Sequence, residues 1–142
     1  ARLYGGIPVH RGEYDRTLIE RMQAALLSGR PLLIAPEGGR SHQPGMRRAL
    51  PGVAYVLEKC PVPVVPVGIT GATDDFLRLA LRGRRPLLRM RIGKPVILPG
   101  EPARGEARRE IRQRHADLIM QHIAWLVPPE YRGVYADDVA EF

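Results

Sequence analysis

The chain has 142 residues, of which 44% are hydrophobic and 26% charged, a balance typical of one globular domain rather than of a disordered chain. Its single cysteine, Cys60, excludes an internal disulfide, and no apolar run approaches the roughly 18 residues needed to cross a bilayer. The net charge of +7, from 22 Lys and Arg against 15 Asp and Glu, favours anionic partners such as acidic lipid, nucleic acid or phosphorylated metabolites.

The first half of the chain predicts helices that alternate with strands. Residues 13–28 carry apolar side chains at helical spacing. Residues 31–35 form a short, continuous apolar run, which predicts a strand buried on both faces. After a polar loop over residues 36–50, Pro51 is well placed as the first residue of a helix over 52–59.

The next segment predicts two strands around a short helix. Residues 62–69 are β-like, but their two prolines cannot complete a hydrogen-bonded ladder, so this strand should lie at an edge or a bend. Thr73 can cap a helix over residues 74–81. Residues 87–97 alternate apolar and basic side chains, the pattern of a half-exposed strand.

The longest predicted helix covers residues 105–127 and ends at Pro128-Pro129. The acidic tail from Tyr131 to Phe142 should pack loosely. Strands that alternate with helices predict an α/β domain with a mixed, largely parallel sheet flanked by helices.

The most informative loop is Ala35-Pro36-Glu37-Gly38-Gly39-Arg40-Ser41. It follows a predicted buried strand, where open α/β sheets place their ligand sites. The glycines let the backbone approach a ligand closely, and the planar guanidinium of Arg40 can pair bidentately with phosphate, for about 1.5–3 kcal/mol. Glu37 is suited to hold an arginine or to accept from a substrate hydroxyl. The alternative is an ordinary turn with a surface Arg–Glu pair.

Two further blocks flank this loop in a specific order: Gly6-Ile7-Pro8-Val9-His10-Arg11 before it and Val62-Pro63-Val64-Val65-Pro66-Val67 after it. Together the three blocks resemble the glycerol-3-phosphate and 1-acylglycerol-3-phosphate (lysophosphatidic acid) acyltransferase family. That family has a Gly-apolar-apolar-acid-Arg block, then Phe-Pro-Glu-Gly-Thr-Arg-Ser, then Val-Pro-Val-Val-Pro-Val. The resemblance covers about residues 5–98 and implies the C-terminal part of such a domain, truncated at its N-terminus.

On this resemblance, residues 1–142 form a single partial acyltransferase domain, with a motif-bearing region at 5–98, a C-terminal helix at 105–127 and a tail at 128–142. Arg11 and Arg40 would bind the phosphate of the acceptor, and residues 63–67 would shape the region near the acyl chain. The substrate-binding residues that the resemblance implies are Arg11, Glu37, Gly38, Gly39, Arg40 and Ser41.

Three positions depart from the family pattern. His10 stands where the second block usually has an acid, and Gly39 replaces the threonine of the third block. Residues 49–52, Ala-Leu-Pro-Gly, replace a Phe-Lys-x-Gly stretch, so that one lysine of the pattern is missing. These differences bear on the identity of the acceptor more than on the family.

The family's catalytic His-x-x-x-x-Asp block should lie upstream of Ala1, so we expect no catalytic residue in this chain. The resemblance implies that its histidine is the general base for the acceptor hydroxyl. His10 and Asp15 have the same spacing, but Arg11 already aligns with the second block. His42 is interpreted as a solvated loop residue, and His115 and His122 as ordinary surface or interface residues of the long helix.

The implied reaction transfers a fatty acyl group from acyl-CoA or acyl-carrier protein to a hydroxyl of a phosphorylated glycerolipid, in phospholipid biosynthesis. The thioester is a substrate, so no bound cofactor is expected, and no metal site is predicted. The expected partners are the thioester and the glycerolipid, with no nucleic acid. The expected location is cytoplasmic, peripheral to the inner face of the cell membrane.

The cluster of basic residues in the second half leaves two interpretations open. It could rest on anionic lipid, or it could be a solvated strand face. Two alternatives to the enzyme also stay open: a non-catalytic basic module that binds membrane or nucleic acid, and an inactive family member. A single-strand reader would need aromatic side chains, which make up only 6% of this chain. The basic residues are Arg78, Arg82, Arg84, Arg85, Arg89, Arg91 and Lys94.

Overall fold

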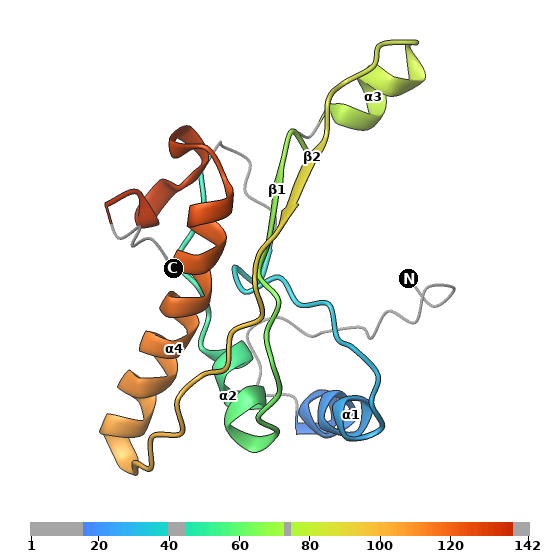
Figure 1. Ribbon diagram of the computed structural model, residues 1–142. Helices are drawn as coiled ribbons and strands as arrows, with labels where there is room; N and C mark the ends of the chain where they lie inside the picture. The colour runs from blue at the N-terminus through green and yellow to red at the C-terminus, as the bar shows by residue number, and fades with distance from the viewer. Residues whose placement is uncertain (1–15, 40–44, 73–74, 138–142) are drawn as a thin grey trace.

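The computed structural model describes residues 16–39, 45–72 and 75–137. Figure 1 shows α4 along one side of the molecule, α2 beside it and α1 beyond α2, while a two-stranded ribbon rises away from these helices to α3. The elements are α1 (Arg16–Leu27), α2 (Gly52–Lys59), β1 (Val67–Thr70), α3 (Phe76–Leu81), β2 (Arg89–Ile92) and α4 (Gly105–Leu126), followed by the 3₁₀ turns η2 (Pro129–Tyr131) and η3 (Gly133–Tyr135).

The hydrophobic core lies where α2 packs against α4. Small side chains let the two helices approach closely: Ala54 from α2 is 2% exposed, and Ala116 and Ala124 from α4 are fully buried. Met120 fills the remaining space, and burying a side chain of this size contributes about 1.5–3 kcal/mol. The core depends on α4 for four of its eight buried residues, Ala116, Ile119, Met120 and Ala124.

The predicted helices are confirmed where the structure describes them. The helix predicted over 52–59 has these bounds, because Pro51 adopts helical torsion angles (φ −69°, ψ −2°) immediately before it. The long helix ends at Leu126, one residue before its predicted end, ahead of Pro128-Pro129. The predicted cap Thr73 lies outside the described residues, and α3 begins at Phe76.

The large, mostly parallel sheet that the sequence predicted is absent from the described part of the chain. The one sheet found there is two-stranded and antiparallel, with β1 paired to β2. On the N-terminal side of β1 the ladder continues only as an isolated pair between Val64 and Val96. Pro63 and Pro66 have no N–H to donate, so they cannot extend it. The prediction of an interrupted strand over 62–69 is therefore confirmed, and that of a parallel sheet is wrong for these residues.

The strand predicted over residues 31–35 is also not formed. These residues are extended but have no strand partner within the described ranges, and the side chain of Leu33 is 98% exposed. A strand buried on both faces requires neighbours that complete its ladder and cover its side chains. The apolar run alone does not supply them.

The C-terminal tail, expected to pack loosely, instead contributes Tyr135 to the core. Tyr135 is only 3% exposed, and its segment lies against residues 45–46. The N–H of Met46 donates to the carbonyl of Tyr131 at 3.0 Å, and the N–H of Val134 donates to the carbonyl of Met46 at 3.2 Å. Gly133, at φ +54°, permits this approach, because an added Cβ would lie 2.2 Å from the Met46 carbonyl oxygen.

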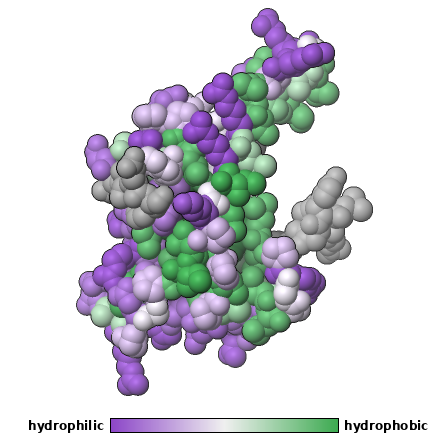
Figure 2. All heavy atoms as spheres, viewed as in Figure 1, coloured by the Kyte–Doolittle hydropathy of each residue, from purple (hydrophilic) through white to green (hydrophobic). Residues whose placement is uncertain are grey.

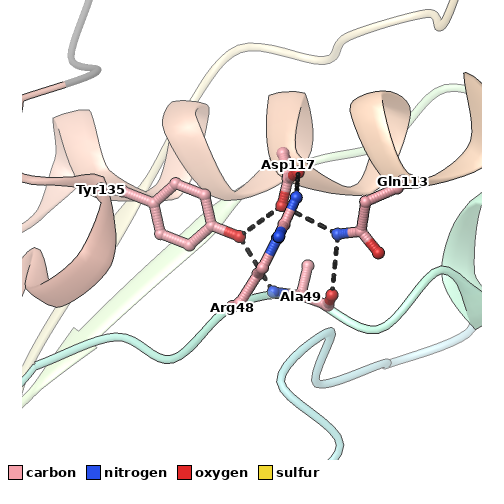
Figure 3. A network of polar contacts seen from close by, with 5 residues as sticks. All are labelled: Arg48, Ala49, Gln113, Asp117 and Tyr135. Carbon is pink, nitrogen blue, oxygen red and sulfur yellow. Dashed lines mark hydrogen bonds and ion pairs between the residues drawn. The ribbon is translucent and has the colours of Figure 1, made fainter. Parts of the chain in front are cut away.

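Figure 3 shows a polar network that fastens this tail, α4 and the segment before α2 together. The Tyr135 hydroxyl donates to Asp117 Oδ1 at 2.7 Å and accepts the Ala49 N–H at 2.9 Å. The Gln113 side-chain amide donates both to Asp117 Oδ1 and to the Ala49 carbonyl, each at 3.0 Å. Arg48 adds an ion pair to Asp117 at 3.3 Å. Both main-chain polar groups of buried Ala49 are thereby satisfied.

Removing the Tyr135 hydroxyl should destabilise the fold. Tyr135→Phe leaves the buried N–H of Ala49 without an acceptor, so we expect a loss of about 1–3 kcal/mol in the free energy of unfolding, measured in urea. Tyr131→Phe is the matched control, since the Tyr131 hydroxyl has no bond to a described residue. Equal losses for the two variants would contradict the role of the network.

Candidate active site

The structure describes half of the predicted substrate-binding residues. Glu37, Gly38 and Gly39 lie in a turn that follows the extended segment 31–35. Arg11, Arg40 and Ser41 lie outside the described residues, as do His10 and His42. The convergence of Arg11 and Arg40 on one phosphate therefore stays a prediction.

Gly38 gives the turn its shape. Its φ of +68° lies in the left-handed region that glycine tolerates best, and its N–H donates to the carbonyl of Ala35 at 3.1 Å. A Cβ at this position would lie 2.4 Å from Leu50 Cδ1, so any side chain would have to displace Leu50. The turn thus brings the backbone of the Pro-Glu-Gly motif against the segment that leads into α2.

Glu37 binds that same segment. Its carboxylate Oε2 accepts the backbone N–H of Arg47 at 2.8 Å, while the Arg47 guanidinium donates to the Glu37 carbonyl at 3.0 Å. The neighbouring Pro36 carbonyl accepts the Leu50 N–H at 2.9 Å. The carboxylate of Glu37 therefore holds the main chain at Arg47, a residue that the sequence did not single out, and the role of Glu37 toward a substrate stays a prediction.

The support for the turn continues to α4. Residues 47–50 hold Glu37 and Pro36, and Ala49 in the middle of them is bound by Gln113 and Tyr135 (Figure 3). Burial is the first cause that raises the pKa of Tyr135 to about 12, and its hydrogen bond to Asp117 adds to the effect. The hydroxyl therefore stays protonated throughout the neutral range, as its hydrogen bond to Asp117 requires.

Apart from the turn, a cleft lies between α2, α4 and the segment 97–104 that precedes α4. None of Glu37, Gly38 and Gly39 reaches it, and its ionisable lining residues are Glu58, Glu101, Arg104, Arg108, Arg112 and His115. Two of its arginines are already bound to Glu58: Arg108 Nε lies 2.8 Å from Oε1 and Arg112 Nε lies 2.6 Å from Oε2. Arg112 also lies over the ring of Tyr55, 4.4 Å from its centroid.

These contacts fix the charge of Glu58. The hydrogen bond from Arg108 is the largest cause that lowers the pKa of this carboxyl to about 2, with Arg112 acting in the same direction against the effect of burial. A carboxylate shared by two guanidinium groups joins α2 to α4. The cleft is therefore explained as a structural ion-pair site.

Of the two interpretations offered for His115, a surface or an interface residue of the long helix, the first is wrong. His115 is 9% exposed, and its Nε2 lies 3.1 Å from Glu101 Oε1; Arg114 pairs with the same carboxylate. The spacing of Ile111, His115 and Ile119 at four-residue intervals places the histidine on the apolar stripe, a signal that could have revealed its burial. His122 is partly buried, and burial lowers its pKa.

Comparison with known proteins bears on the first half of the chain. Residues 1–70 match the family model described as Acyltransferase, a stretch that includes the Gly38 turn and all six predicted substrate-binding residues. No curated protein and no solved structure matches the chain. The match supports the acyltransferase family and acyl transfer in general. Within the described ranges, no helix is both long and apolar enough to cross a membrane.

The Glu58 cluster predicts a defined pH dependence of stability. Its pKa is lowered on folding from an ordinary 4.5 to about 2, so its stabilising effect is complete above pH 4.5 and is lost as the pH falls toward 2. We expect Glu58→Gln to be less stable than the unmodified chain at neutral pH, with a difference that narrows across this window. Urea unfolding at a series of pH values measures it.

Glu110→Gln, at an exposed carboxylate of α4, is the matched control and should lack this pH-dependent difference. A constant gap between Glu58→Gln and the unmodified chain from neutral pH down to 2 would show that the ion pairs are not the source of the stabilisation.

Proposed function

We propose that this chain is part of an enzyme that transfers a fatty acyl group from acyl-CoA or acyl-carrier protein to a hydroxyl of a phosphorylated glycerolipid. The activity would be that of a 1-acylglycerol-3-phosphate acyltransferase-like enzyme of phospholipid biosynthesis, peripheral to the inner face of the cell membrane. The observation that carries the proposal is the Acyltransferase match over residues 1–70, which spans both arginine-bearing motifs.

In this proposal Arg11 and Arg40 bind the acceptor phosphate. A planar guanidinium offers two parallel donors to phosphate oxygens, a geometry that orients the acceptor as well as neutralising it. Arg40 follows the Gly38 turn by two residues. Glu37, whose carboxylate is bound to the Arg47 N–H, shapes the wall of the site without facing the anion, which avoids placing two negative charges together.

The reaction needs one more group than this chain is expected to provide. The acceptor hydroxyl oxygen attacks the thioester carbonyl, a C–O bond forms, the C–S bond breaks, and the hydroxyl proton passes to a general base while the thiolate takes up a proton. We assign the base to the histidine of a His-x-x-x-x-Asp block expected upstream of Ala1. The thioester is a substrate, so the step draws on no bound cofactor.

Phosphate binding tests the site directly. In titrations of the chain with glycerol 3-phosphate, followed by NMR chemical shifts, Arg11→Ala and Arg40→Ala should each weaken binding by about 10-fold or more, the loss expected for one charge-assisted hydrogen bond. Arg84→Ala and Arg91→Ala remove equal charge elsewhere and should change the affinity little. Similar losses of affinity for all four variants would show that the phosphate is bound by non-specific electrostatic attraction and would contradict the proposed acceptor site.

Turnover tests the assignment of the base. General-base catalysis contributes about 10²–10⁴-fold, so the 142-residue chain alone should consume no measurable acyl thioester in a free-thiol assay with lysophosphatidic acid present. Thioester consumption that disappears in His10→Ala would instead make His10 the base.

A further inference from the structure

The ribbon and α3 form an arm, residues 67–94, that projects away from the helices (Figure 1). Its sequence holds seven basic residues and two acidic ones, so this arm carries +5 of the net charge of +7. Among the basic residues, the ion pair that the structure records within the described ranges is Arg78 to Asp75 at 3.5 Å. The arm is thus the most cationic part of the chain.

The ribbon has one apolar and one polar face, and much of the apolar face is exposed. The register pairs Val67 with Ile92 and Ile69 with Met90 on one face, and Gly68 with Arg91 and Thr70 with Arg89 on the other. Gly68 faces the end of α4, since an added Cβ would lie 2.8 Å from Val127 and 2.9 Å from Leu126. The apolar face therefore points away from α4, and Ile69, Met90 and Ile92 are 53%, 61% and 64% exposed.

The tip of the arm exposes leucines as well. Leu77 and Leu81 lie one turn apart on α3 and are 69% and 82% exposed, and Leu87 just beyond it is 64% exposed. The chain between them is basic, with Arg82, Arg84 and Arg85. Figure 2 shows hydrophobic and hydrophilic residues side by side at this end of the molecule. Exposed apolar groups set among cations are typical of a surface that has a partner.

The chemistry of that partner follows from the two properties together. A nucleic acid would neutralise the arginines but leave the leucines in water, and the arm holds a single aromatic residue, Phe76, for base stacking. A second copy of the arm would place two surfaces of net charge +5 against each other, and these would repel. An anionic lipid–water interface satisfies both properties, because its headgroups bind guanidinium groups and its acyl chains accept leucines.

We propose that residues 67–94 are a membrane-docking arm, which inserts Leu77, Leu81 and Leu87 into the interface of an anionic bilayer while its arginines bind headgroup phosphates. This goes beyond acyl transfer and does not depend on it, because the arm contains none of the six predicted substrate-binding residues. It also gives the proposed peripheral location a definite surface and orientation.

Vesicle cosedimentation tests the arm against a charge-matched control. We expect the chain to bind phosphatidylcholine vesicles that contain phosphatidylglycerol, and to bind weakly when that lipid is omitted or salt is high. Replacing Arg82, Arg84 and Arg85 together by Gln should weaken binding by about 10-fold or more. Replacing Arg21, Arg104 and Arg109 by Gln changes net charge equally at exposed positions outside the arm and should leave binding within about 2-fold.

The leucines need their own variant and a direct probe of insertion. Leu77→Ser with Leu81→Ser and Leu87→Ser should also weaken vesicle binding, with urea unfolding as the check that the protein still folds. A polarity-sensitive dye on Leu81→Cys should shift to the blue on addition of the anionic vesicles, and the same dye on Arg109→Cys should not. The native Cys60 is buried, which favours labelling at the introduced thiol.

Three results would overturn the proposal: equal losses from the two arginine triples, binding indifferent to phosphatidylglycerol and salt, or an unshifted dye at position 81. Single-stranded DNA binding that depends on the arm while vesicle binding does not would assign the arm to nucleic acid, and arm-dependent dimers in gel filtration to a second copy. Glycerol 3-phosphate titrations contain no vesicles, so failure of the arm and failure of the acceptor site are distinguishable.

Discussion

Ala49 is the residue on which the rest of this structure depends, because both of its main-chain polar groups are bound from distant parts of the chain. Tyr135 accepts from its N–H and Gln113 donates to its carbonyl, and both side chains also donate to Asp117. In a buried setting, where an unpaired group is costly and a paired one is reinforced by its neighbours, this places residues 47–50 in one position. These residues in turn position the Pro-Glu-Gly turn, because the Arg47 N–H donates to the Glu37 carboxylate and the Leu50 N–H donates to the Pro36 carbonyl. The position of the Pro-Glu-Gly turn therefore depends on α4 through these hydrogen bonds.

The sequence predicted the helices well because the signals for a helix are local. Apolar spacing located α1 and α4, and prolines marked the start of α2 and the end of α4. Strands are different, since a strand is stabilised by a partner whose position the run itself does not encode. Residues 31–35 have the composition of a buried strand, yet no partner lies beside them within the described ranges. The antiparallel pairing of β1 with β2 joins residues that are separated by the whole of α3, and nothing in either segment indicated it.

The same distinction applies to the candidate site. The motif identified Glu37 and Gly38, but the close approach that Gly38 permits in the structure, at a positive φ, is to Leu50, whereas the approach expected from the sequence was to a ligand. The residues that support the motif were not predicted. Tyr135 lies 86 positions from Ala49, in a tail whose acidic composition indicated loose packing. A single buried aromatic in a short polar segment has no periodicity, so its role becomes visible only when α4 is in place to bind it. His115 was a more accessible case, because its place on the apolar stripe of α4 could have been read from spacing alone.

The arginines also have two different roles, in ion pairs within the fold and on the exposed arm, and composition alone does not distinguish them. Around α4, guanidinium groups are bound to protein carboxylates: Arg108 and Arg112 to Glu58, Arg114 to Glu101, and Arg48 to Asp117. These groups join elements of the fold, and their charge is compensated where it stands. In the arm, by contrast, basic residues outnumber acids by seven to two, and leucines lie exposed among them. Charge that is paired inside the protein contributes to stability, whereas charge left unpaired beside apolar surface is available to a partner. Most of the net charge, +5 of +7, therefore lies in one projecting element, and that element can be altered without touching the network that holds the Pro-Glu-Gly turn.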